Sequence, residues 1–184
     1  PRLAELAKIV KPQKIQPAIV EFVDIAGLVA GASKGEGLGN QFLANIRETD
    51  GIVNVVRCFE DDNVVHVAGK VDPISDIATI VTELALADLT TVEKAQERNV
   101  KLVRSGDKDA AKLGELLVQV AACLNEGKPA RTLKLDPAQR ALLKPLCLLT
   151  MKPVMYVANV AEKGFAGNPL LTRVEEYAAH EGAP

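Results

Sequence analysis

The sequence predicts an α/β fold in which a small parallel β-sheet is interrupted by a long pair of helices. Three observations carry this prediction. The first half of the chain has a strand–helix–strand order, which is the βαβ pattern of α/β proteins. Two of the three strand candidates are near-continuous apolar runs, which are typical of parallel strands covered on both faces. Residues 76–126 contain no proline and only two interior glycines, as long helices require.

Local patterns predict the elements of the sheet region. Residues 1–14 begin as a short amphipathic helix that Pro12 ends. The run Ala18–Val23 is β-branched and apolar, and it predicts a buried strand that ends at Asp24. A glycine-rich stretch, Gly27–Gly39, comes next. The remaining expected elements are a helix over Asn40–Thr49, a second strand over Ile52–Val56 and a third strand over Met155–Ala158.

Two helical stripes between the second and third strands predict an antiparallel, coiled-coil-like hairpin. Ser105-Gly106-Asp107 is the turn between its arms, and Gly127-Lys128-Pro129 ends the second arm. Asp136-Pro137 begins a further helix, from Ala138 to Leu149. The first stripe consists of Leu86, Leu89, Val92, Val100 and Val103, and the second of Leu113, Leu116, Leu117, Val120, Cys123 and Leu124. We therefore expect residues 1–74 and 150–184 to build the α/β unit and residues 75–149 to form a helical insertion.

Composition excludes several functional classes. With 48% hydrophobic and 25% charged residues among 184, the chain can bury a core. A formal net charge of −2 argues against a surface that binds polyanions throughout, and the few aromatic residues argue against a stacking platform for single strands. No apolar run reaches the roughly 18 residues of a membrane span. The three cysteines are far apart in the sequence and form neither a disulfide framework nor a CxxC metal site, so we expect a cytoplasmic protein. We also expect no membrane partner and no DNA specificity.

Asp24 and Gly27 form the pattern DxxG at the end of the first expected strand. In P-loop NTPases the Asp of this pattern holds Mg²⁺ through water, and the backbone N–H of the Gly contacts the γ-phosphate. A buried strand would hold the carboxylate in place, and glycine lets the main chain approach a phosphate closely. An ordinary turn at a strand end produces the same four residues, so the pattern alone leaves both interpretations open.

A polar loop, Asn159-Val160-Ala161-Glu162, directly follows the third expected strand. In GTPases the loop at this place has the pattern NKxD, whose carboxylate accepts hydrogen bonds from the guanine N1–H and N2–H₂. Here Val160 replaces the lysine and Glu162 replaces the aspartate, so the carboxylate is displaced by one methylene. We therefore expect weak specificity for GTP. The alternative is a polar loop without a ligand.

Several other positions are candidates for chemistry. Leu28 stands directly after DxxG, where Ras-like GTPases carry the glutamine that orients the attacking water, and an apolar side chain cannot do this. His66 lies in a polar loop with three acids and is a metal ligand, a general acid or base, or a surface residue. Arg47 and Arg57 contact phosphate or a partner, or pair with neighbouring glutamates. The glycine-rich stretch matches neither GxxxxGK[ST] nor GxGxxG and favours a mobile switch segment.

Together these blocks closely resemble the YchF, or Obg-like ATPase, family. The resemblance rests above all on Phe22–Val29, Gly31–Asn40 and Phe42–Thr49. Further matching blocks are Val56–Asn63, Gly69–Pro73 and Thr82–Leu89, so the resemblance extends along essentially the whole chain. It implies a P-loop NTPase of the translation-factor class, with a partial G-domain sheet and an inserted coiled-coil arm.

The resemblance also implies residue roles, a substrate and a partner. Asp24 and Gly27 match the Mg²⁺ and γ-phosphate positions, and Leu28 matches an apolar residue that the family carries in switch II in place of glutamine. His66 falls on the family's proposed catalytic histidine. Three residues match the base-recognition loop: Asn159, Val160 and Glu162. The implied activity is Mg²⁺-dependent hydrolysis of ATP, with GTP used more weakly. The implied partner is the ribosome, through its large subunit and with RNA contact.

One departure from the family limits the expected activity. The family's P-loop, GxxxxGKS, its switch I threonine and its C-terminal TGS domain do not occur in these 184 residues. Because the P-loop supplies most of the phosphate binding, we expect the chain to be a middle fragment of a longer protein and to be inactive alone. The alternative function is a non-catalytic module that binds the ribosome, RNA or a protein through the hairpin, whose tip has an excess of basic residues.

Overall fold

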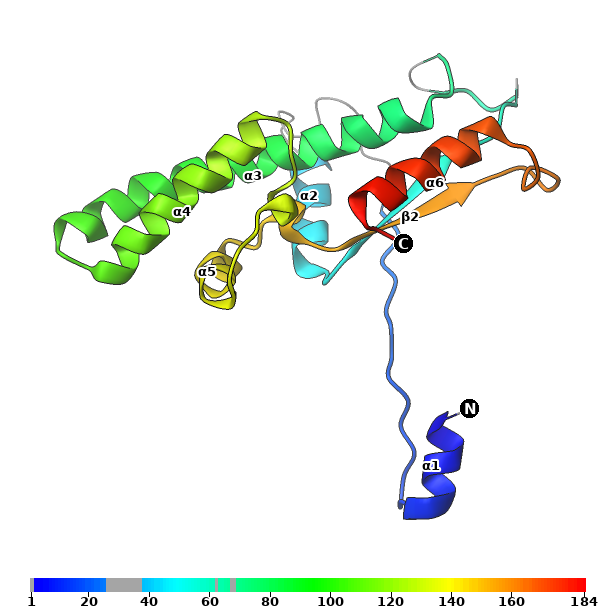
Figure 1. The fold of residues 1–184 in the computed structure, drawn as a ribbon, viewed down its shortest axis with the longest axis horizontal. Coiled ribbons are helices and arrows are strands. Elements are labelled where there is room, and N and C mark those ends of the chain that lie inside the picture. The colour runs from blue at the N-terminus through cyan, green and yellow to red at the C-terminus, as the bar shows by residue number, and fades with distance from the viewer. Residues whose placement is uncertain (1, 26–37, 62, 67–68) are drawn as a thin grey trace.

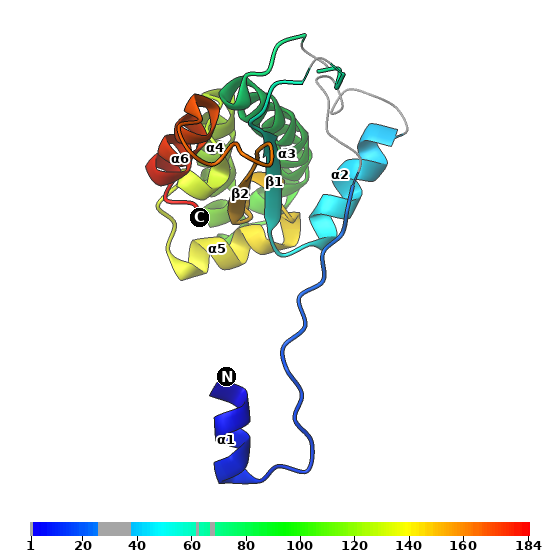
Figure 2. The ribbon, with the colours of Figure 1, turned by 90° about the vertical axis from the view of Figure 1, so that its right-hand side faces the viewer.

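The computed structural model describes residues 2–25, 38–61, 63–66 and 69–184 (Figures 1 and 2). In chain order, the helices and strands are α1 (Arg2–Val10), α2 (Leu38–Glu48), β1 (Ile52–Arg57), α3 (Pro73–Arg104), α4 (Lys108–Asn125), α5 (Pro137–Leu143), β2 (Val154–Asn159) and α6 (Pro169–Glu181). Three short 3₁₀ turns lie between α4 and β2: η1 (Ala130–Thr132), η2 (Lys144–Leu146) and η3 (Leu149–Met151).

The strands β1 and β2 form a two-stranded parallel sheet, which confirms the predicted α/β class. Ile52 lies opposite Val154 at one end of the ladder, and Arg57 lies opposite Asn159 at the other. The helices α3, α4 and α5 lie between the two strands in the chain, as the crossover between parallel strands requires. Both strands therefore end at the same edge of the sheet, beside Arg57 and Asn159.

Helices α3 and α6 pack on one face of this sheet (Figure 2). The buried side chains of this layer include Val56, Ile77, Tyr156 and Val174. The other face carries Val53, Val55, Met155 and Val157, all of which are exposed. The expectation of a sheet covered on both faces is therefore wrong. An apolar run favours burial of both sides of a strand, but the covering elements have to come from other parts of the fold.

Helix α1 is set apart from the rest of the protein, and an extended segment leads from it to the sheet (Figures 1 and 2). The predicted helix forms as α1 but buries none of its residues. The prediction of a buried strand over Ala18–Val23 is wrong, because this segment has no strand pairing and Val20 is 74% exposed. The segment lines a cleft of about 780 Å³, and Val53 and Met155 of the sheet line the same cleft. Propensity alone makes no strand, because a strand needs a hydrogen-bonded neighbour.

Helices α3 and α4 form the predicted antiparallel hairpin (Figure 1). Asp107 caps α4 by accepting hydrogen bonds from the N–H groups of Asp109 and Ala110, and Gly106 has a positive φ of 85° in the turn. Among the helices of the described residues, long α3 included, none is apolar enough over a sufficient length to cross a bilayer.

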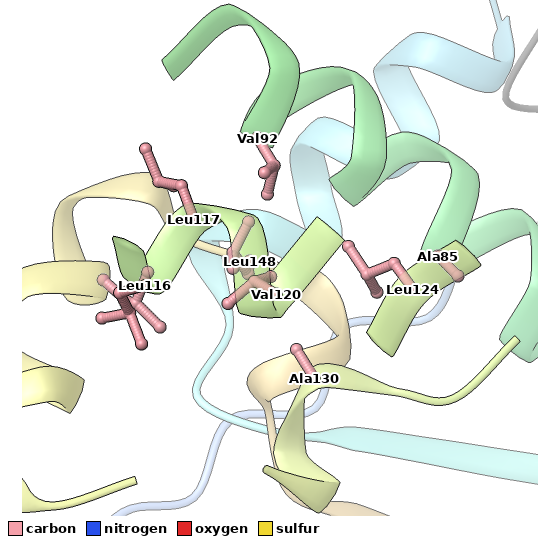
Figure 3. Close-up of a cluster of buried hydrophobic side chains, with 9 residues drawn as sticks. Ala85, Val92, Leu116, Leu117, Val120, Leu124, Ala130 and Leu148 are labelled. Atoms are coloured by element: carbon pink, nitrogen blue, oxygen red, sulfur yellow. The ribbon is translucent and has the colours of Figure 1, made fainter. Parts of the chain in front are cut away.

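The hairpin core contains Val92 of α3 together with Leu117 and Val120 of α4 (Figure 3). The predicted stripe of α4 is confirmed. Leu113 packs against the hairpin core, and the other five members are buried: Leu116, Leu117, Val120, Cys123 and Leu124. The stripe of α3 is partly wrong, because three of its members are exposed: Leu86, Val100 and Val103. Val100 and Val103 lie near the tip, where the two helices have only one another to pack against, so side chains beside the contact line meet solvent.

The helix after the hairpin is shorter than expected. Helix α5 begins at Pro137 behind a capping box of Asp136 and Gln139, as the Asp-Pro pair predicted. It ends at Leu143 rather than at Leu149. Pro145 supplies the reason, because a proline cannot donate the next helical hydrogen bond and restricts the residue before it.

A buried carboxylate joins α3 to the turn that leads into β2. Asp88 is fully buried, and it accepts hydrogen bonds from the N–H of Leu149 at 2.8 Å, the N–H of Thr150 at 2.7 Å and the hydroxyl of Thr150 at 2.6 Å. Burial raises the pKa of Asp88, while the donors of Thr150 and Leu149 oppose that shift. This contact holds the start of β2 against α3.

Candidate active site

The carboxyl edge of the sheet brings together the loops that follow both strands. The backbone N–H of Cys58 donates to the carbonyl of Asn159 at 2.7 Å, which extends the pairing one step beyond β1. Asn168, at the N-terminus of α6, donates from Nδ2 to the carbonyl of Cys58 at 2.8 Å and accepts from the N–H of Leu170. Burial raises the pKa of the Cys58 thiol. In open α/β sheets, ligands bind outside this edge.

Arg57 holds the loop that leaves β1. Its guanidinium donates to three backbone carbonyls: Nε to Phe59 at 3.0 Å, Nη1 to Val64 at 3.0 Å and Nη2 to Asp61 at 3.3 Å. The same group lies 4.6 Å from the centre of the Phe59 ring, a cation–π distance. Arg57 is therefore a structural clamp on the loop rather than a free phosphate contact.

His66 lies at the far end of this loop and contacts α3. Its Nε2 lies 3.0 Å from Oδ2 of Asp76, in the first turn of α3, and the two side chains are 16% and 33% exposed. Asp72 caps the N-terminus of α3, and its carboxylate accepts hydrogen bonds from the N–H of Ser75 and from Arg173 at 3.0 Å. The hydrogen bond from Ser75 and then the Arg173 guanidinium lower the pKa of Asp72.

The other predicted site residues are spread over the molecule. Asn159 and Glu162 are exposed, and Val160 packs against the cluster below the sheet. Asp24 is exposed at the end of the N-terminal segment, and no hydrogen bond or ion pair within the described part of the chain joins it to His66. Two predicted residues lie outside the described residues: Gly27 and Leu28. Arg47 donates to Thr91 of α3 at 3.3 Å, which joins α2 to α3.

The donor groups are compatible with a magnesium–nucleotide site. Over residues 2–25, 38–61, 63–66 and 69–184, no group of three or more His, Cys, Asp or Glu side chains is arranged to hold a metal ion. Mg²⁺ that is bound with a nucleotide needs fewer protein ligands, because it keeps several waters and takes oxygens from the phosphates. The exposed carboxylate of Asp24 fits that limited requirement.

Sequence reasoning missed two residues of this edge. Asp76 is the partner of His66, and Asn168 ties the start of α6 to the end of β1. The signals for the two helix starts were present, because Asp72-Pro73 and Asn168-Pro169 are each a cap residue followed by proline. No pattern in the sequence indicates that Asp76 and His66 meet, because the contact depends on how a loop and a helix start pack together.

Comparisons with known proteins agree on one family. Residues 6–103 match the family described as "50S ribosome-binding GTPase". The chain is 57% identical over its whole length to the ribosome-binding ATPase YchF of Haemophilus influenzae, and 51% identical over 99% of its length to that of Bacillus subtilis. The solved structure of the Schizosaccharomyces pombe YchF GTPase has a TM-score of 0.77 and 35% identity over 97% of this chain.

The chain spans about half the length of the curated relatives it matches, and 50% of the solved yeast chain. Within that half, nearly the whole of this chain is covered by the matches. This chain belongs to the YchF family of GTPase-domain proteins.

Proposed function

We propose that the protein carrying this chain hydrolyses ATP with Mg²⁺, uses GTP more weakly and associates with the ribosome. One observation carries the proposal: the loop that bears His66 and the loop Asn159–Glu162 leave the same carboxyl edge of the sheet, where α/β proteins bind ligands. The relatives from Haemophilus influenzae and Bacillus subtilis are named ribosome-binding ATPases, which supports the same activity and partner.

The proposed roles at the phosphate end follow from chemistry. Asp24 would hold Mg²⁺ through a water molecule, and the metal would supply charge neutralisation at the phosphates. Gly27 offers its backbone N–H to the γ-phosphate, and Leu28 leaves the attacking water without the glutamine of Ras-like GTPases. His66 then positions this water or exchanges a proton with it.

At the base end, the proposed contacts come from Asn159, Val160 and Glu162. Adenine has no N2 amino group, so a carboxylate built to accept two hydrogen bonds from guanine gives no advantage with ATP. Glu162 is exposed and one methylene longer than the aspartate of NKxD, and Val160 offers no charged contact. These features support a site that accepts ATP at least as well as GTP.

The proposal also includes a division of labour along the chain. Residues 1–74 and 150–184 contribute the nucleotide-binding unit, and residues 75–149 contribute a helical insertion that reaches outward. The partner is the large ribosomal subunit, with RNA contact, and the protein works in the cytoplasm.

The decisive experiment compares wild type with His66→Ala in the complete protein that carries this chain. We expect kcat for ATP to fall by roughly 10²–10⁴-fold while the affinity for ATP stays unchanged, because the side chain acts on water rather than on the nucleotide. His180→Ala, at the exposed end of α6, is the matched control and should leave kcat unchanged. Loss of ATP affinity in His66→Ala would make the histidine structural and would contradict its proposed role.

Base selection has its own test. Replacing Val160 with Lys and Glu162 with Asp restores the NKxD pattern, and we expect the ratio of GTP to ATP affinity to rise about tenfold or more. The single change Val160→Lys is the control, because it adds charge without restoring the carboxylate. An unchanged ratio in the double variant would exclude this loop from base recognition.

A second candidate function, a binding module without catalysis, is favoured by the hairpin tip. Lys101 and Arg104 are exposed there, in a group of six basic residues that also contains Lys94, Arg98, Lys108 and Lys112. Clustered cations bind phosphate backbones, although Lys112 already lies 3.7 Å from Asp109. Reversing the charge of Lys101 and Arg104 should weaken co-sedimentation with ribosomes and leave basal ATP hydrolysis unchanged. Reversing Lys8 and Lys11 in the N-terminal segment should change neither.

A further inference from the structure

We propose that Asp76 is the positioning residue for His66: its carboxylate accepts the Nε2–H hydrogen bond and thereby sets the orientation of the imidazole. This inference rests on the proposed function, in which His66 acts on the attacking water. The distance between Nε2 of His66 and Oδ2 of Asp76 is 3.0 Å, and both side chains are mostly shielded from solvent. At this distance a carboxylate orients an imidazole in the way that the aspartate of a Ser-His-Asp triad does.

Asp76 is itself held in place by a rigid support. Its backbone N–H donates to the carbonyl of Asp72 at 3.0 Å, inside the first turn of a 32-residue helix. The neighbouring side chain, Ile77, is 1% exposed and belongs to the cluster beneath the sheet. A side chain whose own helix turn is packed in this way can hold a partner within the narrow geometry that catalysis needs.

The loop that carries His66 is held from its other end as well. The guanidinium of Arg57 bonds to three carbonyls of residues 59–64, and Asp61 accepts the N–H of Asn63 at 2.9 Å. The carbonyl of His66 accepts the N–H of Gly69 at 2.9 Å. Contacts from the end of β1 and from the start of α3 therefore define where the ring lies.

The direction of the hydrogen bond has a chemical consequence. When Nε2 carries the proton that Asp76 accepts, the lone pair of the neutral ring is on Nδ1. In that tautomer Nδ1 is the acceptor nitrogen of the ring. If it takes up a proton, the ring becomes an imidazolium whose charge lies beside the carboxylate of Asp76.

A purely structural role for Asp76 is the competing explanation. An acid in the first turn of a helix stabilises the helix N-terminus whether or not it touches a histidine. The two explanations differ in kinetics, because a helix-stabilising residue has no reason to act through His66 on turnover alone.

The test uses Asp76→Asn in the complete protein that carries this chain, with Glu93→Gln as the control. Glu93 is an exposed acid on the same helix, so the control removes the same charge away from His66. We expect Asp76→Asn to lower kcat about 10²-fold with an unchanged KM for ATP. Asp76→Glu keeps a carboxylate and should retain more kcat than Asp76→Asn. The double variant His66→Ala with Asp76→Asn should be no slower than His66→Ala alone.

Three results would overturn the inference: a normal kcat in Asp76→Asn, an equal loss in Asp76→Glu, or a double variant that shows the product of the two single losses. A second measurement separates this inference from the proposed function. In the imidazole ¹⁵N spectrum of the complete protein that carries this chain, His66 is the reporter and His180 is the internal reference. Asp76→Asn should shift the ring nitrogens of His66 alone. If His66→Ala leaves kcat normal while this shift occurs, the proposed role of His66 fails and the Asp76 contact stands. If the shift does not occur, the contact itself is refuted.

Discussion

Two segments of similar composition adopt different structures in this protein. Ile52–Arg57 forms strand β1, whereas Ala18–Val23 forms no strand and lies exposed. Both are short and rich in β-branched residues, and both were predicted as strands. The difference lies in what surrounds them: β1 has β2 beside it and α3 above it, and Ala18–Val23 faces an open cleft. Strand formation therefore depends on a neighbour more than on propensity.

The largest effect is expected from placing a charge in each segment. Val56→Asp puts a carboxylate at a position that is 2% exposed, and the unpaired buried charge should lower the free energy of unfolding by about 3–5 kcal/mol. Val20→Asp, at a position that is 74% exposed, should change it by less than about 0.5 kcal/mol. Urea unfolding followed by circular dichroism measures both, and equal losses would remove the distinction between the segments.

The second-largest effect is expected at Asp88, which holds the chain just before β2, the strand that pairs with β1. Asp88 holds Leu149 and Thr150 just before β2, so Asp88→Ala leaves buried donors without an acceptor and should cost about 3 kcal/mol. Glu93→Ala, on the exposed side of the same helix, should cost less than about 0.5 kcal/mol. A small loss for Asp88→Ala would mean that β2 is held by other contacts.

This prediction has a pH dependence with a definite sign. Because burial raises the pKa of Asp88 above its ordinary value of 3.8, the folded state binds the proton more tightly than the unfolded state does. The stability contributed by the protonated group is fully present below the unfolded pKa and is lost as the pH rises through the folded pKa. The gap in unfolding free energy between wild type and Asp88→Ala should therefore narrow from acid pH towards neutrality, as urea titrations at several pH values would measure.

A smaller effect separates the two faces of β1. Val56→Ala removes two buried methyl groups and should cost about 2 kcal/mol. Val55→Ala, one position earlier and 63% exposed, should cost less than about 0.5 kcal/mol. The same unfolding assay applies, and a comparable loss at Val55 would show that the open face of the sheet is covered in solution.

The smallest perturbation needs no mutation. The N–H groups of Ile52 and Cys58 donate to Pro153 and Asn159 and should be protected against hydrogen exchange. The amides of Ile19–Val23 should exchange at the rate of an unstructured peptide. Amide exchange measured by NMR or mass spectrometry tests both expectations. Protection within Ile19–Val23 would mean that this segment is hydrogen-bonded as a strand, like β1.

Much of the fold was predictable because its signals are local. The turn at Ser105–Asp107, the capping box at Asp136 and the long helices on either side of the turn each depend on residues within a few positions of one another. The same holds for the two strands that pair. Errors arose where a local pattern had to be placed against the rest of the molecule, as for Ala18–Val23 and for the exposed members of the α3 stripe.

In the candidate site, too, some features are indicated by the sequence and others arise only in the folded protein. The DxxG pattern and the loop Asn159–Glu162 stand out in the sequence because each is a short motif with a chemical meaning, whereas His66 is marked only by the resemblance to the YchF family. The sequence contained no sign that Asp76 meets His66 or that Arg57 clamps the loop that leaves β1. Short motifs and caps are written within a few consecutive residues, whereas these contacts arise when a strand end, a loop and a helix start pack together. Side chains that are distant in the chain become neighbours only through that packing, and so the identity of the histidine's partner depended on the folded structure.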